Sequence, residues 1–155
     1  MKTAAFAFVK GRFGGLLLAG LLTLTATPTF ASANVDCVID DRFIKFEMEA
    51  IAGRNGPIVQ VNVGTIAIKP AGGITTSAPE IAFDRTHITQ QWLYGDDLRL
   101  HFEINDEKAR ELIELVIQAR LDKKREKYAG GYVLKVSRDG KSKELKGRIK
   151  ECVAG

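Results

Sequence analysis

Apolar and polar residues alternate along most of the chain after residue 33, with the period of two that is typical of half-buried β-strands. The clearest run is residues 42–51, in which apolar side chains from Ile44 to Ala50 occupy one face and lysine or glutamate the other. Clusters of glycine, proline and asparagine separate such runs. The pattern predicts an all-β fold: a small antiparallel meander that closes into a barrel or a sandwich.

The central hairpin of this fold is predicted over residues 87–105, where two alternating runs flank Gly95-Asp96-Asp97. A three-residue loop pairs Trp92 with Leu100 and gathers nearly all the apolar side chains on one face. A two-residue loop sets Gln91 against Leu100 instead, which is a poorer match. We therefore predict the three-residue loop, with Trp92 on the apolar face.

Other segments follow the same logic. Residues 58–68 carry no charge and are rich in Val and Ile, which predicts a strand buried on both faces or nearly so. Residues 69–79 hold two prolines and two adjacent glycines, which predicts a long loop, and a short strand is expected at 80–83. Near the C-terminus, a strand over 131–138 runs into a tight turn at 138–141, which leads to the last strand.

Residues 105–127 fit two patterns. A helix gathers apolar side chains on one face, but Arg120 then falls within the apolar arc. A strand gives five consecutive alternations over 113–121 and continues the meander. We favour the strand and keep a single helix near 106–120 as the alternative.

The first 33 residues are predicted to be a signal peptide and not to belong to the fold. Three basic residues precede an apolar core at 16–24, and Ala31-Ser32-Ala33 resembles a cleavage site. The apolar core is too short to span a bilayer. We therefore expect cleavage after Ala33, a single β-rich domain over 34–155 and a periplasmic or secreted location, with no membrane span in the mature chain.

The chain has two cysteines, Cys37 and Cys152, one near each end of the predicted mature chain. In an exported protein, an even number of cysteines predicts a disulfide. A loop of this length restricts the unfolded chain by about 4–5 kcal/mol when the effect is treated as chain entropy. We therefore predict a Cys37–Cys152 bond that joins the first strand to the last.

Removal of the leader changes the charge balance. The leader holds three of the 23 Lys and Arg residues and no acid, which leaves 20 bases against 19 acids and a net charge of +1. The basic pI is therefore no argument for a nucleic acid partner. The charges are unevenly distributed, however: residues 34–97 hold 5 bases and 9 acids, and residues 98–155 hold 15 bases and 10 acids.

Several short motifs are spread over the C-terminal half of the chain: Gln91-Trp92, Leu98-Arg99-Leu100, Glu114-Leu115-Val116-Ile117, Tyr128-x-Gly130-x-Tyr132-x-Leu134-x-Val136, Leu145-x-Gly147 and Cys152. In these motifs the chain resembles a group of small exported bacterial proteins that have no assigned function. The resemblance implies a β-rich fold and a location in the cell envelope. It implies no activity.

Catalytic and metal-binding patterns are sparse. His87 and His101 are expected on facing strands, opposite Asn105 and Gln91, but no third ligand accompanies them, whereas a zinc site needs three or four. The sequence has no G-x-S-x-G motif, and the predicted disulfide occupies both cysteines. We therefore expect no enzymatic activity, no metal and no cofactor; an unrecognised hydrolase is the alternative.

A row of basic residues is the one predicted surface feature that points to a partner. Lys146, Arg148 and Lys150 share a face by period two, and Lys135 lies on the preceding strand. Such a row can bind an anionic envelope polymer, a lipid head group or an acidic protein. Lysines on outer strands also block edge-to-edge aggregation.

We therefore expect a monomeric exported module that binds, or inhibits, an envelope component or protein. The alternative is a structural or accessory envelope protein without a ligand of its own.

Overall fold

The computed structural model describes residues 32–53 and 56–154. These residues form one antiparallel sheet of ten strands, so the predicted all-β fold is confirmed. The strands are β1 (Ser32–Asp40), β2 (Ile44–Gly53), β3 (Ile58–Ile68), β4 (Ile81–Ala82), β5 (Ile88–Tyr94), β6 (Asp97–Asp106), β7 (Glu111–Asp122), β8 (Lys127–Arg138), β9 (Lys141–Arg148) and β10 (Glu151–Ala154), with two short 3₁₀ turns, η1 (Pro70–Gly72) and η2 (Arg85–His87).

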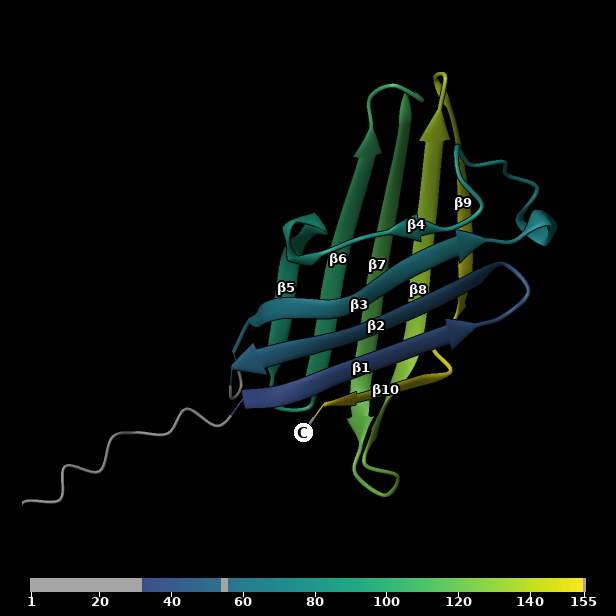
Figure 1. The fold of residues 1–155 in the computed structure, drawn as a ribbon. Helices are drawn as coiled ribbons and strands as arrows, with labels where there is room; N and C mark the ends of the chain where they lie inside the picture. Colours follow the sequence, from purple (N-terminus) through teal and green to yellow (C-terminus); the bar gives the residue numbers. More distant parts are fainter. Residues whose placement is uncertain (1–31, 54–55, 155) are drawn as a thin grey trace, which may run out of the picture.

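The sheet curls into a half-barrel of two layers (Figure 1). Strands β1 to β4 form the front layer, and β5 to β9 form a back layer that they cross steeply. The strand order is β4-β3-β2-β1-β10-β8-β7-β6-β5. β10 pairs with β8 at Tyr128, and β9 pairs with the rest of β8 from Gly131 to Arg138. β10 therefore joins the two layers.

The predicted leader lies mostly outside the described residues. Of its 33 positions, only Ser32 and Ala33 are described, and they pair with Gly53 and Ala52 at the start of β1. Among residues 32–53 and 56–154, no helix is long and apolar enough to cross a membrane.

The core lies between the two layers. Three phenylalanines from different elements meet at its centre: Phe46 stacks on Phe83 at 5.3 Å between ring centroids, and Phe102 meets both rings edge-on. Such pairs each contribute about 0.5–1.5 kcal/mol beyond their burial. Gly64 lets Phe83 approach β3, because a Cβ atom at residue 64 would lie 2.3 Å from the Phe83 carbonyl oxygen.

The strand predicted between residues 105 and 127 is confirmed as β7, and the alternative helix near 106–120 is wrong. β7 pairs with β8 along its whole length and with β6 from Glu111 to Arg120. Its alternate side chains from Ile113 to Ala119 are buried, while Gln118 and Arg120 are exposed. Pairing on both edges therefore decides in favour of the strand.

The predicted hairpin loop is wrong by one residue. Tyr94 pairs with Asp97, so the loop has two residues, Gly95 and Asp96. Gly95 has a φ of 59° and Asp96 does not have a positive φ, as in a type II′ turn. A bulge at Thr89 then restores the inward direction of Ile88, and this bulge removes the mismatch that argued against the shorter loop.

The prediction that residues 58–68 are buried on both faces is also wrong. Ile58 and Ile66 are buried, but Val59 is 60% exposed. β3 belongs to a single layer with one face toward solvent, and β4 covers its edge only at Thr65 and Ile66. Its lack of charge therefore does not mean full burial. The predicted loop at 69–79 and the short strand after it are both found, as η1 with flanking loop and as β4.

The C-terminal hairpin has the predicted tight turn. Asp139 and Gly140 both have positive φ, 50° and 76°, as a type I′ turn requires. The predicted single last strand is split, however, because β9 ends at Arg148 and β10 begins at Glu151.

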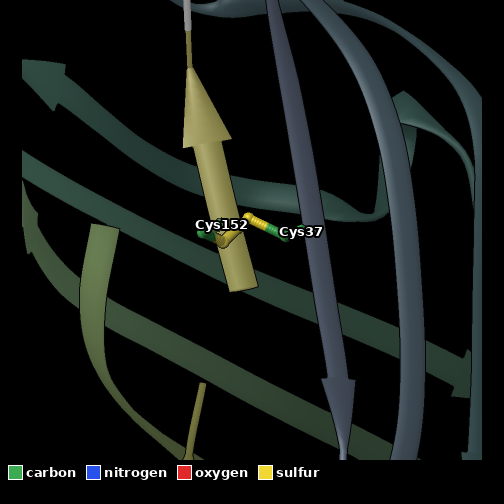
Figure 2. Close-up of a disulfide and its surroundings, with 2 residues drawn as sticks. All are labelled: Cys37 and Cys152. Carbon is green, nitrogen blue, oxygen red and sulfur yellow. A yellow bond between two sulfur atoms is a disulfide. The ribbon is translucent and has the colours of Figure 1, made fainter. Parts of the chain in front are cut away.

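The predicted Cys37–Cys152 disulfide is confirmed (Figure 2). The two cysteines face each other in the register of β1 and β10, and both are fully buried. Cys152 also pairs with Tyr128 of β8. The bond therefore fixes the strand that joins the two layers.

Candidate functional site

The outer face of the back layer carries two neighbouring rows of side chains that cross all five strands from β5 to β9. We call these two rows the central stripe. The strand register places in the first row Trp92, Arg99, Gln118, Gly131 and Arg148, and in the second row Gln90, His101, Val116, Val133 and Lys146.

The central stripe is basic. Its two rows contain three bases, Arg99, Lys146 and Arg148, and no acid. Lys146 Nζ lies 2.9 Å from a carboxylate oxygen of Glu144, and Arg99 lies 3.9 Å from Asp97. Exposed ion pairs of this kind contribute only about 0.2–1 kcal/mol, so both bases remain free to exchange their partner for a ligand.

Acidic residues flank the stripe on both sides. The next row on one side contains Glu103, Glu114 and Glu144, and the row on the other side contains Asp97, which pairs with Arg120. Lys135 lies within the first of these rows, paired with Glu144 in the register. An excess of bases over acids is therefore confined to the two rows of the stripe.

Two open hollows lie along the stripe. One has a volume of about 310 Å³ and lies between Trp92, His101 and Gln118; the other, of about 300 Å³, lies over Gly131 and Val133. Val116 and Gln118 line both hollows, so the two adjoin. The glycine deepens the second hollow because it has no side chain.

Two large aromatic side chains stand at one end of the stripe. Trp92 is 55% exposed and Tyr94 is 69% exposed, and their ring centroids lie 6.0 Å apart. They line a further hollow of about 230 Å³ with Pro57 of the β2–β3 turn. With Val59, they are the only large hydrophobic side chains that are exposed in the described part of the chain. Clustered exposed aromatic surface of this kind typically marks a binding site.

Side chains hold β5 beside β3 in place of backbone pairing. Gln91 Oε1 accepts the Ile58 amide at 2.6 Å, and Gln91 Nε2 donates to the Ile58 carbonyl at 3.4 Å. Arg85 Nε also donates to that carbonyl at 2.6 Å, and Arg85 Nη1 donates to the Ile88 carbonyl. These bonds fix the strand that presents Trp92.

The predicted basic residues are only partly brought together. Lys146 and Arg148 lie on the stripe, whereas Lys135 lies in the flanking acidic row. There Lys135 Nζ donates a hydrogen bond to Glu114 at 2.8 Å, and this bond raises the pKa of Lys135. Lys150 lies beyond the end of β9, so its predicted alignment with the other two is wrong. There it contributes, after Lys69, to the lowered pKa of Asp40.

The aromatic half of the site was missed at the sequence level, because the predicted register placed Trp92 on the apolar face. The signal that could have found it is Gly95, since glycine at the first position of a two-residue loop is typical of a type II′ turn. That shorter loop turns Trp92 and Tyr94 outward.

The single buried charged side chain in the described residues, Glu111 of β7, holds the loop between η1 and β4. Its carboxylate accepts the Ser77 amide at 3.1 Å and the Ser77 hydroxyl at 2.9 Å. Arg138 lies 3.8 Å away and donates to the Thr75 carbonyl. A second basic hollow lies beside this loop and is lined partly by Lys141 and Lys143.

A second polar contact joins the layers. Tyr132 Oη donates to Asp41 Oδ2 at 2.7 Å, and Asp41 Oδ1 accepts the amides of Phe43 and Ile44. Burial raises the pKa of Asp41, but these hydrogen bonds outweigh it, so the pKa lies below its usual value. Burial, and then the Asp41 contact, raise the pKa of Tyr132.

The predicted strand positions of the two histidines, opposite Asn105 and Gln91, are both wrong. His87 belongs to η2, where Nδ1 lies 2.9 Å from Asp84, and His101 pairs with Gln90 on the stripe. Within residues 32–53 and 56–154, no group of three or more His, Cys, Asp or Glu side chains is placed to hold a metal ion.

No family model, curated protein or solved structure matches this chain. The resemblance to small exported proteins therefore stays a prediction. What the surface can do follows from its own geometry: a narrow basic line with polar amides, two hollows and an exposed aromatic pair suits a ligand held by many weak contacts.

Proposed function

We propose that this protein is an exported binding module that holds an anionic polymer of the cell envelope along the central stripe. The observation that carries the proposal is the continuity of the stripe: three bases and no acid share two rows with the exposed ring of Trp92. A surface with one sign of charge concentrates ligands of the opposite sign.

The dimensions of the stripe favour an extended ligand. Five strands at a spacing of about 4.8 Å give a row roughly 19 Å long. Arg99 and Arg148 lie three strands apart in that row, so a single small anion cannot contact both. A chain with repeated charges can, and its separate weak contacts then add up.

The flanking acids argue against a flat anionic surface such as a lipid bilayer. Counted with its two flanking rows, the stripe has five bases against four acids, a net charge of only +1: Arg99, Arg120, Lys135, Lys146 and Arg148 against Asp97, Glu103, Glu114 and Glu144. A membrane would meet all of these charges at once. A single polymer chain meets only the stripe.

The disulfide supports a location outside the cytoplasm, because such bonds persist in oxidising compartments. The predicted signal peptide agrees with this location. We therefore place the proposed partner in the periplasm or outside the cell.

A second candidate function is a structural or accessory envelope protein without a ligand. It is favoured by the position of β9, which pairs only with β8 and carries exposed Lys141, Lys143 and Lys146. Bases on such a strand protect a sheet edge from aggregation. On this view the charges of the stripe serve solubility alone.

Charge reversal separates the two functions. The triple variant Arg99→Glu, Lys146→Glu and Arg148→Glu is compared with Lys45→Glu, Lys108→Glu and Lys124→Glu, which changes the net charge equally at exposed positions away from the stripe. Binding to immobilised polygalacturonate and polyphosphate is measured at rising salt, with thermal midpoints as the folding control.

We expect the parent and the control variant to bind and the stripe variant to lose binding. The binding should weaken above about 0.1 M salt, because at that concentration exposed charges more than about 10 Å apart are largely screened from each other. Equal losses in the two variants, or no binding by the parent to either polymer, would favour the structural function.

A further inference from the structure

We infer that the bound polymer is an acidic polysaccharide, and that Trp92 and Tyr94 form the platform on which its sugar rings stack. This inference rests on the function proposed above and names the class of its ligand. It starts from the aromatic pair at the end of the stripe, which the basic residues alone do not explain.

The aromatic pair is suited to stacking. Trp92 and Tyr94 are both more than half exposed, and their rings meet edge to face at 6.0 Å. The hollow beside Pro57 and the hollow beside His101 open on two sides of Trp92.

The C–H faces of pyranose rings are apolar, and an aromatic ring can cover them as it covers other apolar surfaces. A polyphosphate has no such face. The exposed aromatic pair therefore distinguishes a sugar polymer from a polymer of phosphates.

The polar groups around Trp92 fit the rest of a sugar acid. Arg99 is the direct strand partner of Trp92, and a guanidinium can bind a carboxylate with two parallel hydrogen bonds. Gln90 and Gln118 line the adjoining hollow with His101. Their amides both donate and accept hydrogen bonds, which matches sugar hydroxyls.

The density of charge also favours a sugar acid. The stripe offers three bases along its length and is flanked by Asp97, Glu103, Glu114 and Glu144. A polyphosphate chain, with a charge on every unit, would bring several charges close to these acids. A polysaccharide with carboxylates spaced by sugar rings places fewer charges along the same length.

Trp92 is the only tryptophan of the chain, so its fluorescence reports on the proposed platform directly. The full protein is titrated with oligogalacturonate, with uncharged maltooligosaccharide, with inorganic polyphosphate and with phosphatidylglycerol vesicles. We expect oligogalacturonate to shift the Trp92 emission at the lowest concentration. Tighter binding of polyphosphate or of the vesicles would overturn the inference in favour of a phosphate polymer or a lipid surface.

Substitution separates stacking from charge. Trp92→Ala and Tyr94→Ala should each weaken oligogalacturonate binding by about tenfold, measured by calorimetry, while Trp92→Phe keeps most of it. The control variant Val59→Ala removes an apolar side chain of β3 that is similarly exposed but is not part of the aromatic pair. It should leave binding unchanged. Polyphosphate, if it binds weakly, should bind all of these variants alike.

The failure of this inference is distinguishable from failure of the proposed function. If charge reversal on the stripe abolishes oligogalacturonate binding but Trp92→Ala does not weaken it, the proposed function holds and the stacking platform is wrong. If the parent binds none of the four probes, both are wrong, and a protein partner becomes the better explanation of the exposed aromatic pair.

Discussion

The front and back layers meet on two sides of the molecule, and the two sides are closed differently. On one side, β10 pairs with both β1 and β8, and the Cys37–Cys152 bond fixes it (Figures 1 and 2). On the other side, β3 and β5 are held by the side chains of Gln91 and Arg85 on Ile58. We call these the bonded side and the open side.

The difference separates stability from binding. On the bonded side the cysteines are fully buried and the backbone is paired. The open side leaves β5 as an edge strand, and its outward residues are Gln90, Trp92 and Tyr94. Edge strands usually carry charge or proline to avoid aggregation. The exposed aromatic side chains at this edge therefore support the proposed contact with a ligand.

The largest effect is expected on the bonded side. The disulfide closes a loop of 115 residues, and its loss should lower the free energy of unfolding by about 4–5 kcal/mol on the chain-entropy account. Thermal melts with and without reductant, and of the Cys37→Ala/Cys152→Ala variant, should show a fall on the order of 15 °C. Two alkylatable thiols in the native protein would contradict this prediction.

A smaller effect is expected from Tyr132→Phe, which removes the hydrogen bond to Asp41 between the layers. Hydrogen bonds to charged groups contribute about 1.5–3 kcal/mol, and Asp41 keeps its two backbone donors in the variant, so we expect a loss near the low end at pH 7. Urea unfolding measures it. The variant Tyr128→Phe, on the same strand, is the control because the Tyr128 hydroxyl has no hydrogen-bond partner among residues 32–53 and 56–154.

The same variant should change the acid limb of stability. The pKa of Asp41 is lowered on folding, so its contribution is present above the usual carboxyl value of about 3.9 and is lost as pH falls through the folded value. The difference between the parent and Tyr132→Phe should therefore shrink between about pH 4 and the acid transition. A difference that stays constant down to the acid transition would show that Asp41 is not the partner that matters.

The smallest stability effect is expected on the open side. Gln91→Ala removes both side-chain bonds to Ile58, but Arg85 still holds the Ile58 carbonyl. We expect a loss of about 1 kcal/mol. Hydrogen exchange should show faster exchange of the Ile58 amide. Gln90→Ala, an exposed neighbour, should change neither quantity, and equal effects of the two variants would show that β5 is held in another way.

Most of the strands could be predicted from the sequence, because the alternation of apolar and polar residues is a local pattern. The disulfide could be predicted because the chain has only two cysteines. The orientation of Trp92 could not. The orientation of Trp92 depends on the hairpin loop, which is one residue shorter than predicted. The bulge at Thr89 reverses this shift in register, so Ile88 still points inward. Register is sensitive to a single residue, which moves every following side chain to the other face.

The candidate site was predicted only where it follows one strand. Lys146 and Arg148 were found by period two, but Lys150 was misplaced because the strand was continued past Ile149. The buried residues Ile149 and Cys152 are three positions apart, which breaks the period of two and marks the gap between β9 and β10. Arg99 and Gln118 join the site through the register between β6 and β7, which fixes which side chains of the two strands lie side by side. The pattern along one strand does not show the register of that strand with its neighbour.

The most direct test of the proposed binding surface is a map of backbone amide shifts by NMR as oligogalacturonate is added to the isotope-labelled protein. We expect the shifts to concentrate on the stripe, at residues such as Trp92, Gln118, Gly131 and Lys146, while the front layer and the bonded side stay unchanged. Shifts confined instead to the basic hollow at Lys141 and Lys143, or spread evenly over both layers, would contradict the central stripe as the binding surface.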